Sequence, residues 1–393
     1  MRKRLKGENG KNMAVNPRRL VMVRPQAKSF YERWIASEGV PVLDGIVVPD
    51  VCRIPLRYWR RLGCDGAYLQ LKGLQGITGA YVGKLAPGAA TEPEKHLYEK
   101  IIYILEGEGV AEVQQRHRVP QAFSWQAGSL FAPPINSTHR LTNCSKEPAR
   151  FLAVTTAPTV FDHFHNERFI FSSDFCFSDR YDGEPEFFAA GEQRFLAAQT
   201  RQWIAETNFI ADVKRQDVAA HEQKGAGVRM IQIELANNTL AAQLAEWPVG
   251  AYDKAHYQGG GAIFVALKSK GYSLTWPMEL GRRPYESGCG DLVTRIDWEP
   301  GTVFSPPAHC FQQHFNTGAE PAMQLALACG SQKFPLGVTL ASTGAGVYTS
   351  VKQGGTLIEY ADEDPAIRRG FTAELRQSGI ASVITLDVAA NHD

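Results

Sequence analysis

The chain has 393 residues, of which 44% are hydrophobic and 21% are charged, and its formal net charge is +1. A single hydrophobic core rarely grows past about 250–300 residues, so this length predicts two domains. A net charge this close to zero does not attract nucleic acid or anionic membranes, and no apolar run approaches the roughly 20 residues of a membrane span. We therefore expect a cytoplasmic protein that binds neither nucleic acid nor membrane.

The N-terminal segment and the cysteines agree with this expectation. Residues 1–26 are rich in lysine and arginine, and no apolar segment follows that would make a secretory signal, so we expect a flexible basic tail. The cysteines are odd in number and scattered, without a C-x-x-C pair. That pattern favours reduced thiols over a disulfide framework or a zinc knuckle.

Short strands are the main predicted elements, preceded by one helix. Phe30, Trp34 and Ile35 stand at helical spacing and Gly39 follows them, which predicts a helix that packs on the domain behind it. Beyond it, alternating or wholly apolar runs are separated by Gly, Pro and Asn at intervals of about eight to twelve residues. This spacing predicts an antiparallel sandwich or barrel, so the expected fold class is all-β. The runs cover residues 79–85, 101–113, 129–133 and 150–155.

The sequence also repeats itself, which indicates a tandem duplication. The segment "WQAGSLFAPP" (Trp125–Pro134) recurs as "WEPGTVFSPP" (Trp298–Pro307). At the same interval "EPARFLAV" recurs as "EPAMQLAL", and Asn143 matches Asn316. The run "IIYILEGEGVAEV" resembles "IFVALKSKGYSLT" at a slightly shorter interval, and this difference predicts an extra hairpin loop within residues 279–291.

These patterns define five segments of the chain. The linker between the repeated units is dense in aromatic residues, so we expect it to pack between the domains or against another subunit. Together with exposed strand edges, that apolar surface predicts a homodimer or a higher homo-oligomer. The segments are the basic tail (1–26), a first domain with its leading helix (27–158), the linker and start of the second unit (159–244), a second domain (245–335) and a C-terminal extension (336–393).

The repeated blocks resemble the two sequence motifs of the cupin superfamily. One motif runs from a glycine through H-x-H and a glutamate to a second glycine, and the other runs through P-x-G to a histidine and an asparagine. Both occur twice, over roughly residues 75–158 and 245–332, and the chain looks like a bacterial bicupin. The resemblance implies two tandem jelly-roll barrels with a few peripheral helices and a site inside each barrel, but no particular activity.

In the first barrel, the resemblance implies a ligand set that departs from the family pattern of three histidines and a glutamate. Counted back from Gly107, Lys100 takes the glutamate slot, while His96 and Glu94 take the two histidine slots. His139 takes the histidine slot of the second motif. The implied metal ligands are therefore Glu94, His96 and His139, with Lys100 beside them.

Strand alternation is consistent with this placement. His96 and Lys100 share parity with Ile102 and Ile104, so they point into the barrel if the isoleucines line its core. Glu99 then points outward. It could act as the carboxylate ligand only if a bulge shifted the register by one residue.

One interpretation of this site is a metal enzyme. Two imidazoles and a carboxylate hold non-haem Fe(II) with open positions for substrate and O₂, and Mn, Ni or Zn could occupy the same site. The barrel would then be a dioxygenase-like oxidoreductase acting on a small polar or aromatic acid, with Lys100 and His139 as catalytic residues. Lys100 also opposes the metal, because an ammonium a few ångströms from a divalent cation is repelled.

The other interpretation has no metal. A Glu94–Lys100 ion pair across the barrel would replace it, and His96 and His139 would be hydrogen-bonding groups of a small-molecule pocket. Such a protein would bind or sense its ligand, or would act as an isomerase with the two histidines and Lys100 as acid and base. A third interpretation leaves the histidines a purely structural role in the core.

The second barrel has lost most of the implied ligands. His256 takes the first histidine slot, whereas Gln258, Ala262 and Gln312 take the other three. No metal is expected there. His314 shares parity with Gln312 and could also enter the barrel, so the side chains at 256, 258, 312 and 314 predict a small-molecule pocket or the remnant of a site.

Two other features are not expected to form sites. The arginine cluster "RYWRRLG" at 57–63 could steer an acidic substrate, but such a run usually forms a solvated face, and we expect that here. The glycines of "GLQGITG" at 73–79 fit no phosphate-binding loop. Nucleotide binding is therefore not expected.

Overall fold

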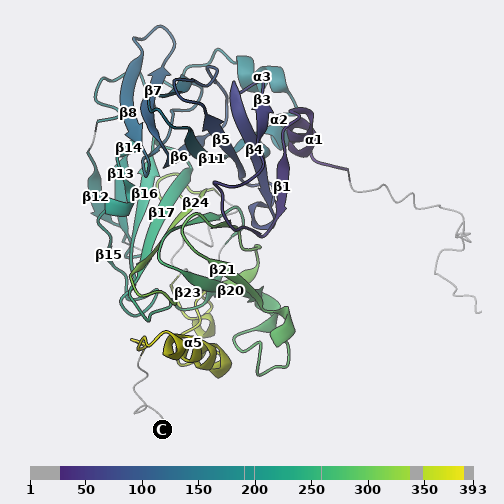
Figure 1. Ribbon diagram of the computed structural model, residues 1–393, viewed down its shortest axis with the longest axis vertical. Helices are drawn as coiled ribbons and strands as arrows, with labels where there is room; N and C mark the ends of the chain where they lie inside the picture. Colours follow the sequence, from purple (N-terminus) through teal and green to yellow (C-terminus); the bar gives the residue numbers. More distant parts are fainter. Residues whose placement is uncertain (1–26, 190, 199, 258, 337–347, 385–393) are drawn as a thin grey trace, which may run out of the picture.

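The computed structural model describes residues 27–189, 191–198, 200–257, 259–336 and 348–384. The expected basic tail lies outside these residues. The described chain is mostly β-structure and contains two barrels, as predicted, each built from one large and one small sheet (Figure 1).

The first barrel combines eleven strands in two sheets. The large sheet has the order β1-β4-β5-β11-β6-β9-β14, with β3 beside β4, and the small sheet has the order β10-β7-β8. The predicted runs correspond to β5, β6 with β7, β9 and β11. The strands are β1 (Val42–Gly45), β3 (Arg57–Trp59), β4 (Cys64–Leu71), β5 (Gly79–Leu85), β6 (Lys100–Glu106), β7 (Glu108–Gln114), β8 (Gln121–Gln126), β9 (Leu130–Phe131), β10 (Thr138–Asn143), β11 (Ala149–Thr155) and β14 (Phe209–Ile210).

The second barrel repeats this arrangement. Its large sheet has the order β12-β13-β16-β17-β24-β19-β22-β2, with β15 beside β16, and its small sheet has the order β18-β23-β20-β21. The predicted extra loop lies between β20 and β21. The strands are β2 (Val47–Val48), β12 (Gln193–Leu196), β13 (Trp203–Thr207), β15 (Ala219–Ala220), β16 (Arg229–Leu235), β17 (Leu240–Trp247), β18 (His256–Tyr257), β19 (Ile263–Lys268), β20 (Gly271–Pro277), β21 (Thr294–Trp298), β22 (Val303–Phe304), β23 (Cys310–Asn316) and β24 (Ala322–Cys329).

The two units exchange a strand. β1 pairs in parallel with β4 of the first barrel, whereas β2, which follows it, pairs with β22 of the second. In the same way β13 pairs in parallel with β16 of the second barrel, and β14 pairs with β9 of the first. The duplication therefore includes residues 42–48 and 203–210, which are too dissimilar in sequence to be matched by eye. The expected boundary at residue 245 falls inside β17, and strands of the second barrel begin well before it.

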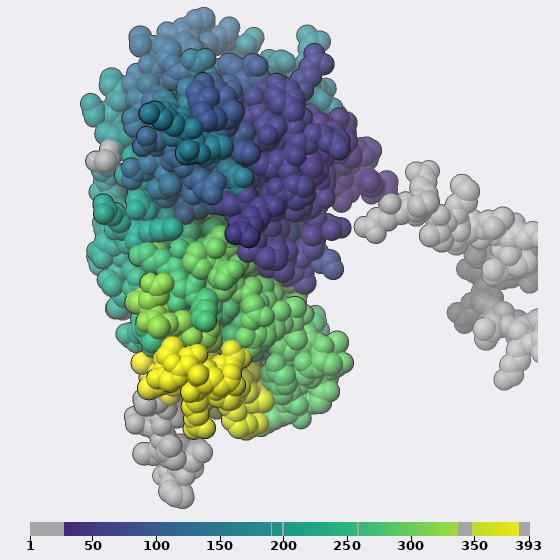
Figure 2. All heavy atoms as spheres, in the orientation of Figure 1, coloured from purple at the N-terminus to yellow at the C-terminus, as the bar shows by residue number. Residues whose placement is uncertain are grey.

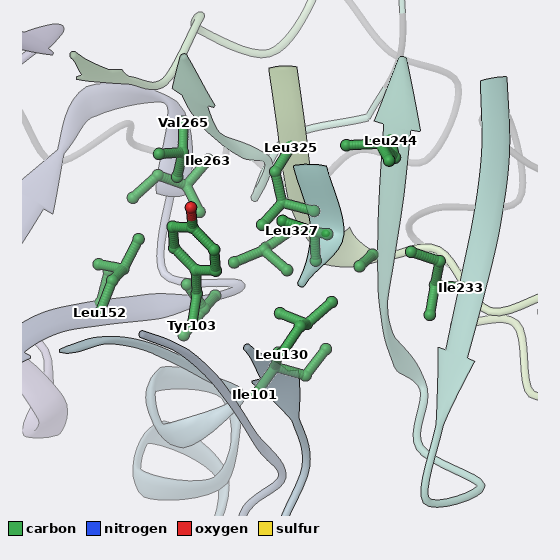
Figure 3. Close-up of a cluster of buried hydrophobic side chains, with 14 of the residues drawn as sticks. Ile101, Tyr103, Leu130, Leu152, Ile233, Leu244, Ile263, Val265, Leu325 and Leu327 are labelled. Carbon is green, nitrogen blue, oxygen red and sulfur yellow. The ribbon is translucent and has the colours of Figure 1, made fainter. Parts of the chain in front are cut away.

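The two large sheets pack face to face and bury a continuous apolar core between the barrels (Figure 3). Ile101 and Tyr103 of β6 point into this core, whereas Ile102 and Ile104 point into the first barrel. Because side chains alternate along a strand, this confirms the parity predicted for β6. Ile263 of β19 takes the place of Ile101 in the second unit.

In each unit a glycine and a tryptophan recur together because the tryptophan ring packs against the glycine. Gly109 of β7 lies against the indole of Trp125, and Gly271 of β20 lies against the indole of Trp298. A Cβ atom at either glycine would overlap both the ring and a backbone carbonyl. The tryptophan that covers the strand therefore requires the glycine in each barrel.

Asn143 and Asn316 hold equivalent loops. Nδ2 of Asn143 donates to three carbonyls at 3.3, 3.1 and 2.8 Å, which lie at the end of β5 and just before β11. Nδ2 of Asn316 donates to three matching carbonyls at 3.2, 3.0 and 2.9 Å, at the end of β17 and just before β24. Each amide thus joins two neighbouring strand ends in its barrel.

Three helices cover the first barrel. They are α1 (Phe30–Ser37), which is the predicted helix, and α2 (Ala157–Phe164) and α3 (Glu167–Ser172) from the linker. The ring of Trp34 lies 4.2 Å from that of Phe161 and 5.8 Å from that of Phe171, measured between centroids. This part of the linker therefore packs on α1 and the first barrel and not between the barrels; the other expected arrangement, packing against another subunit, stays a prediction. The predicted homo-oligomer stays a prediction.

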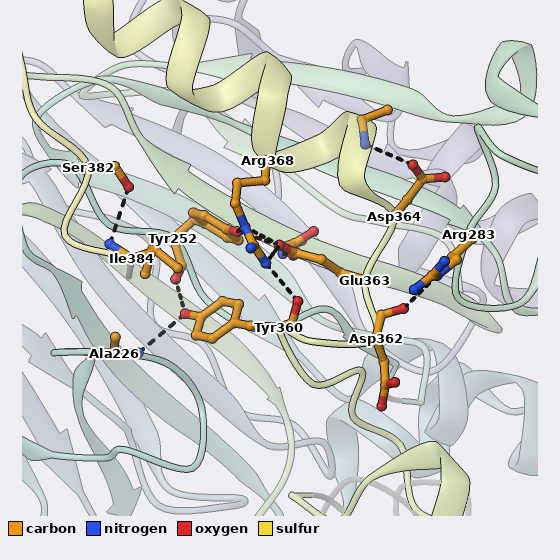
Figure 4. Close-up of polar contacts among 12 residues, drawn as sticks. Ala226, Tyr252, Arg283, Tyr360, Asp362, Glu363, Asp364, Arg368, Ser382 and Ile384 are labelled. Atoms are coloured by element: carbon orange, nitrogen blue, oxygen red, sulfur yellow. Dashed lines mark hydrogen bonds and ion pairs between the residues drawn. The ribbon is translucent and has the colours of Figure 1, made fainter. Parts of the chain in front are cut away.

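The C-terminal extension belongs to the second barrel. Its helix α5 (Pro365–Gln377) buries Ile367 and Phe371 against the small sheet (Figure 2 shows it in yellow at the end of the molecule). Ahead of it, Glu363 accepts a hydrogen bond from Tyr252 Oη at 2.6 Å and pairs with Arg368 (Figure 4). No helix within the described ranges is long and apolar enough to cross a lipid bilayer.

We predict that Asn143→Ala and Asn316→Ala each lower the free energy of unfolding by about 2–4 kcal/mol, because each variant leaves three carbonyls without their donor. Urea unfolding at neutral pH measures the loss. Gln126→Ala, on the exposed edge of β8, is the control and should change stability by less than about 0.5 kcal/mol. A loss below about 1 kcal/mol in both asparagine variants would contradict the role described.

Candidate functional site

The candidate site of the first barrel is assembled by an isolated backbone bridge. Glu94 N donates to His139 O at 2.8 Å, and His139 N donates to Glu94 O at 2.9 Å. Lys100 is the first residue of β6, on the face that points into the barrel. The backbone therefore brings Glu94, His96, Lys100 and His139 together, as predicted, and all four side chains are buried.

Lys100 lies at the centre of this group. Its Nζ donates to Glu94 Oε2 at 2.6 Å and is 3.1 Å from His139 Nε2. The residue has a relative exposure of 0%, so no water-facing position is open to the ammonium in this conformation. The hydrogen-bonding partners of the cation are thus a carboxylate and an imidazole, both within the barrel.

The hydrogen bonds define the tautomers of both imidazoles. His139 Nδ1 lies 3.3 Å from Ser137 O, and His96 Nδ1 lies 2.8 Å from Tyr98 O. Carbonyl oxygens only accept, so each Nδ1 carries the hydrogen and each Nε2 carries a lone pair. His139 Nε2 accepts from Lys100. His96 Nε2 is buried and has no partner in the described part of the chain.

A second cation reaches the same carboxylate. Arg61 Nη1 donates to Glu94 Oε1 at 3.0 Å, and its Nε donates to Glu38 Oε2 at 2.6 Å. The guanidinium lies over the rings of Trp34 and Trp59, 5.1 and 4.8 Å from their centroids. The predicted solvated face is therefore wrong for Arg61. Nothing in the arginine run singles this residue out, because its carboxylate partners, Glu38 and Glu94, come from distant segments.

Burial and the two cations set the charges of the site. Burial opposes ionisation of Glu94, but the charges of Lys100 and Arg61 outweigh it and hold the pKa of Glu94 below its usual value. Burial, followed by the charge of Lys100, lowers the pKa of His139 to about 3. Burial also lowers the pKa of Lys100, and Glu94 offsets part of this shift. Glu94 is thus ionised and His139 neutral at neutral pH.

The donor set fits a divalent metal poorly while Lys100 is charged. The ammonium occupies lone pairs of Glu94 and His139 that a metal would need, and it would repel the ion at this distance. Within the described residues, no group of three or more His, Cys, Asp or Glu side chains is arranged to hold a metal. Of the two imidazoles, only His96 keeps an Nε2 without a partner among the described residues.

Glu99 lies on the other face of β6 and has a structural role. Its carboxylate accepts from Thr239 N at 3.0 Å and Leu240 N at 2.9 Å, at the start of β17, and from Arg180 Nη1 at 3.0 Å. The outward direction predicted from parity is therefore correct. The irregularity in the pairing of β6 with β11 lies at Leu105 and does not turn Glu99 inward.

The second barrel brings together His256, Gln312 and His314. His256 Nε2 lies 3.5 Å from Gln312 Nε2, and the two histidine rings are 6.4 Å apart between centroids. Ala262 is buried against the same interior surface. Gln258, the remaining predicted pocket residue, lies outside the described residues.

The comparisons with known proteins agree with this fold. Residues 81–155, from β5 to β11, match the family model of the cupin domain. The second unit repeats the strand order and the matched Gly, Trp and Asn contacts of the first. Residues 81–155 therefore form a cupin domain, and the repeated second unit gives the described chain a bicupin architecture with two tandem barrels.

Two solved structures illustrate the likeness, both at 13% sequence identity. An oxalate decarboxylase from Bacillus subtilis has a TM-score of 0.46 and covers 73% of this chain and 77% of its own. A formate complex of the oxalate decarboxylase from Lactobacillus farciminis has a TM-score of 0.45 and covers 76% and 89%. A similarity this low says nothing about the reaction of this chain. No curated protein sequence matches it.

The neutral state of His139 makes stability depend on pH. An unfolded histidine binds a proton below about pH 6.5, whereas a pKa of about 3 keeps His139 unprotonated in the folded protein. Between these values the unfolded state binds more protons, so stability is complete above the unfolded pKa and falls as the pH is lowered. One such histidine contributes a loss of about 1.4 kcal/mol between roughly pH 7.5 and 5.5.

We predict that His139→Gln removes about 1.4 kcal/mol of the loss in unfolding free energy that the wild type shows over this pH interval. Urea unfolding at the two pH values measures it. His163→Gln, at an exposed position of α2, is the control and should keep the wild-type pH dependence. If His139→Gln kept it as well, a neutral buried His139 would be refuted.

Proposed function

We propose that the first barrel is a metal-independent binding site for a small polar molecule, in which the Lys100 ammonium stands where typical cupins hold a metal. The observation that carries the proposal is the contact of Lys100 Nζ with Glu94 Oε2 at 2.6 Å and His139 Nε2 at 3.1 Å. A buried cation already bonded to two of the three implied ligands makes metal binding unfavourable.

The free lone pair of His96 supports the choice of ligand. Its Nε2 is buried without a partner within the described residues, and leaving a buried acceptor unpaired costs about 1–3 kcal/mol. A hydroxyl or N–H group of a ligand would satisfy it. Tyr98, whose ring stacks on His96 at 3.7 Å between centroids, would limit the size of the ligand.

An isomerase-like activity is a second candidate function, supported by the Lys100–His139 contact. The ammonium and the neutral imidazole are within hydrogen-bond distance, and burial lowers the pKa of both groups. A lysine that loses its proton more easily than usual is suited to general acid catalysis, and the imidazole to general base catalysis. The same ligand site would then support proton transfer.

We predict that protein purified without added metal contains only substoichiometric transition metal, and that a chelator leaves its melting temperature unchanged. The reason is that Lys100 already satisfies Glu94 and His139. Inductively coupled plasma mass spectrometry and thermal unfolding measure the two quantities. A stoichiometric metal that is lost in His139→Ala would refute the proposal and support the metal enzyme.

Lys100→Glu reverses the charge at the centre of the site. We predict that this variant gains one Mn²⁺ or Zn²⁺ per chain, because two imidazoles and two carboxylates would then face each other and the ammonium between Glu94 and His139 would be gone. Isothermal titration calorimetry measures the gain. Lys95→Glu, a partly buried lysine that pairs only weakly with Asp174 among the described residues, is the matched control and should gain none. If Lys100→Glu bound no more metal than the wild type, the ammonium would not be what keeps metal out.

A further inference from the structure

The interior of the second barrel contains several buried polar atoms without partners among the described residues. His314 Nε2, Gln312 Oε1, Thr275 Oγ1 and both amide atoms of Gln324 are buried and lack a hydrogen-bond partner within the described residues. Each of these residues has a relative exposure of 3% or less. Unpaired buried groups are costly, so their concentration in one place is suited to binding a polar ligand.

Strand pairing places these atoms in one interior. Gln324 of β24 lies between Ala245 of β17 and Ala266 of β19, and both alanines line the barrel. Gln312 and Thr275 are paired across β23 and β20. Because alanine side chains are short, Ala245 and Ala266 leave space on both sides of Gln324 in the barrel interior.

Lys224 brings a positive charge to the same place. Lys224 lies between β15 and β16, outside the cupin motifs, and has a relative exposure of 4%. Its Nζ lies 6.0 Å from the ring centroid of Trp247, which is 5.5 Å from that of His314. Its ion pair within the described ranges is with Asp253 Oδ2 at 3.9 Å, beyond hydrogen-bond distance.

Asp253 leaves much of this charge uncompensated. Its Oδ1 accepts from the backbone N of His314 at 2.6 Å, and Oδ2 has no hydrogen-bond donor in the described chain. Burial raises the pKa of Asp253 to about 7, against the opposing charge of Lys224. Burial also lowers the pKa of Lys224, and Asp253 offsets part of that shift, so burial disfavours the charged form of both groups and an anion beside Lys224 would stabilise the ammonium.

His314 adds a donor on the same side. Its Nδ1 lies 2.7 Å from Ser273 Oγ, which accepts from Trp298 Nε1 at 3.1 Å. The hydroxyl hydrogen of Ser273 has no other acceptor within the described residues, so it points at His314 Nδ1. The ring hydrogen of His314 is then on the unpaired Nε2. An N–H group, an ammonium and the amide of Gln324 thus face the interior.

We propose that the second barrel binds a small organic carboxylate, with its anionic group between Lys224, His314 and Gln324. Charge-assisted hydrogen bonds from an ammonium and N–H donors are the usual means of recognising a buried carboxylate. The rings of Trp247, Phe264 and Phe304 surround His314 at 5.3 to 6.1 Å between centroids and would contact an apolar or aromatic body. This site is separate from the one proposed in the first barrel, and it does not depend on it.

The test compares 4-fluorobenzoate with its neutral analogue 4-fluorobenzamide, by ¹⁹F NMR titration of the full chain. We expect the carboxylate to bind at least about tenfold more tightly than the amide, and Lys224→Met to remove this preference. Lys254→Met is the matched control, because this lysine of the same barrel pairs with Glu359 at 2.7 Å and should not affect binding.

A second variant, similar in volume to the wild-type residue, separates a loss of binding from a loss of folding. Gln324→Leu has a similar volume and no hydrogen-bonding group, and we expect it to weaken benzoate binding while circular dichroism shows a folded chain. Absence of benzoate binding, equal binding of both probes, or binding that neither Lys224→Met nor Gln324→Leu weakens would overturn the proposal. Binding that only His96→Phe weakens would place the probe in the first barrel and would overturn it as well.

Discussion

The hydrogen bonds of the Lys100 ammonium are the constraint on which the first barrel depends. A cation buried this deeply must be met by negative charge and lone pairs, and Glu94 and His139 supply both. Arg61 and Glu38 extend the arrangement, so two cations face two carboxylates under the helices that cover the barrel. The same contacts occupy the groups that a metal would use. Both members of this ion pair, Glu94 and Lys100, depart from the ligand pattern that the cupin resemblance implies, and β6 presents Lys100 on the face that points into the barrel.

The double-barrel frame holds this arrangement in place. The large sheets share one core, and each unit contributes a short strand to the barrel of the other, β2 to the second and β14 to the first. Glu99 ties β6 to the start of β17 from the opposite face of the strand that presents Lys100. A change of register in β6 would therefore disturb the site and the contact between the barrels together. The exchange also makes the two barrels a single structural unit, in spite of their separate interiors.

Much of the fold could be predicted from the sequence because its signals are local or repeated. Alternation along β6 identified the inward and outward residues, and the Gly, Trp and Asn matches identified the duplication. The exchanged strands could not be found, because β2 and β14 are two residues long and carry no pattern. Arg61 could not be found either, since its carboxylate partners, Glu38 and Glu94, come from segments far away in sequence. Lys224 was missed for the same reason, because it lies outside the motifs that frame the second barrel.

The two barrels share one strand arrangement but differ in how the polar groups of their interiors are paired. In the first, Lys100 bonds to a carboxylate and an imidazole of the interior, whereas in the second several buried polar atoms have no partner among the described residues. The central claim concerns the first barrel, and a crystal structure with anomalous diffraction data collected at transition-metal edges tests it most directly. We expect electron density for Lys100 Nζ in contact with the side chains at 94 and 139, and no anomalous peak among them. An anomalous peak bound by Glu94, His96 and His139, with the lysine turned away, would contradict the account.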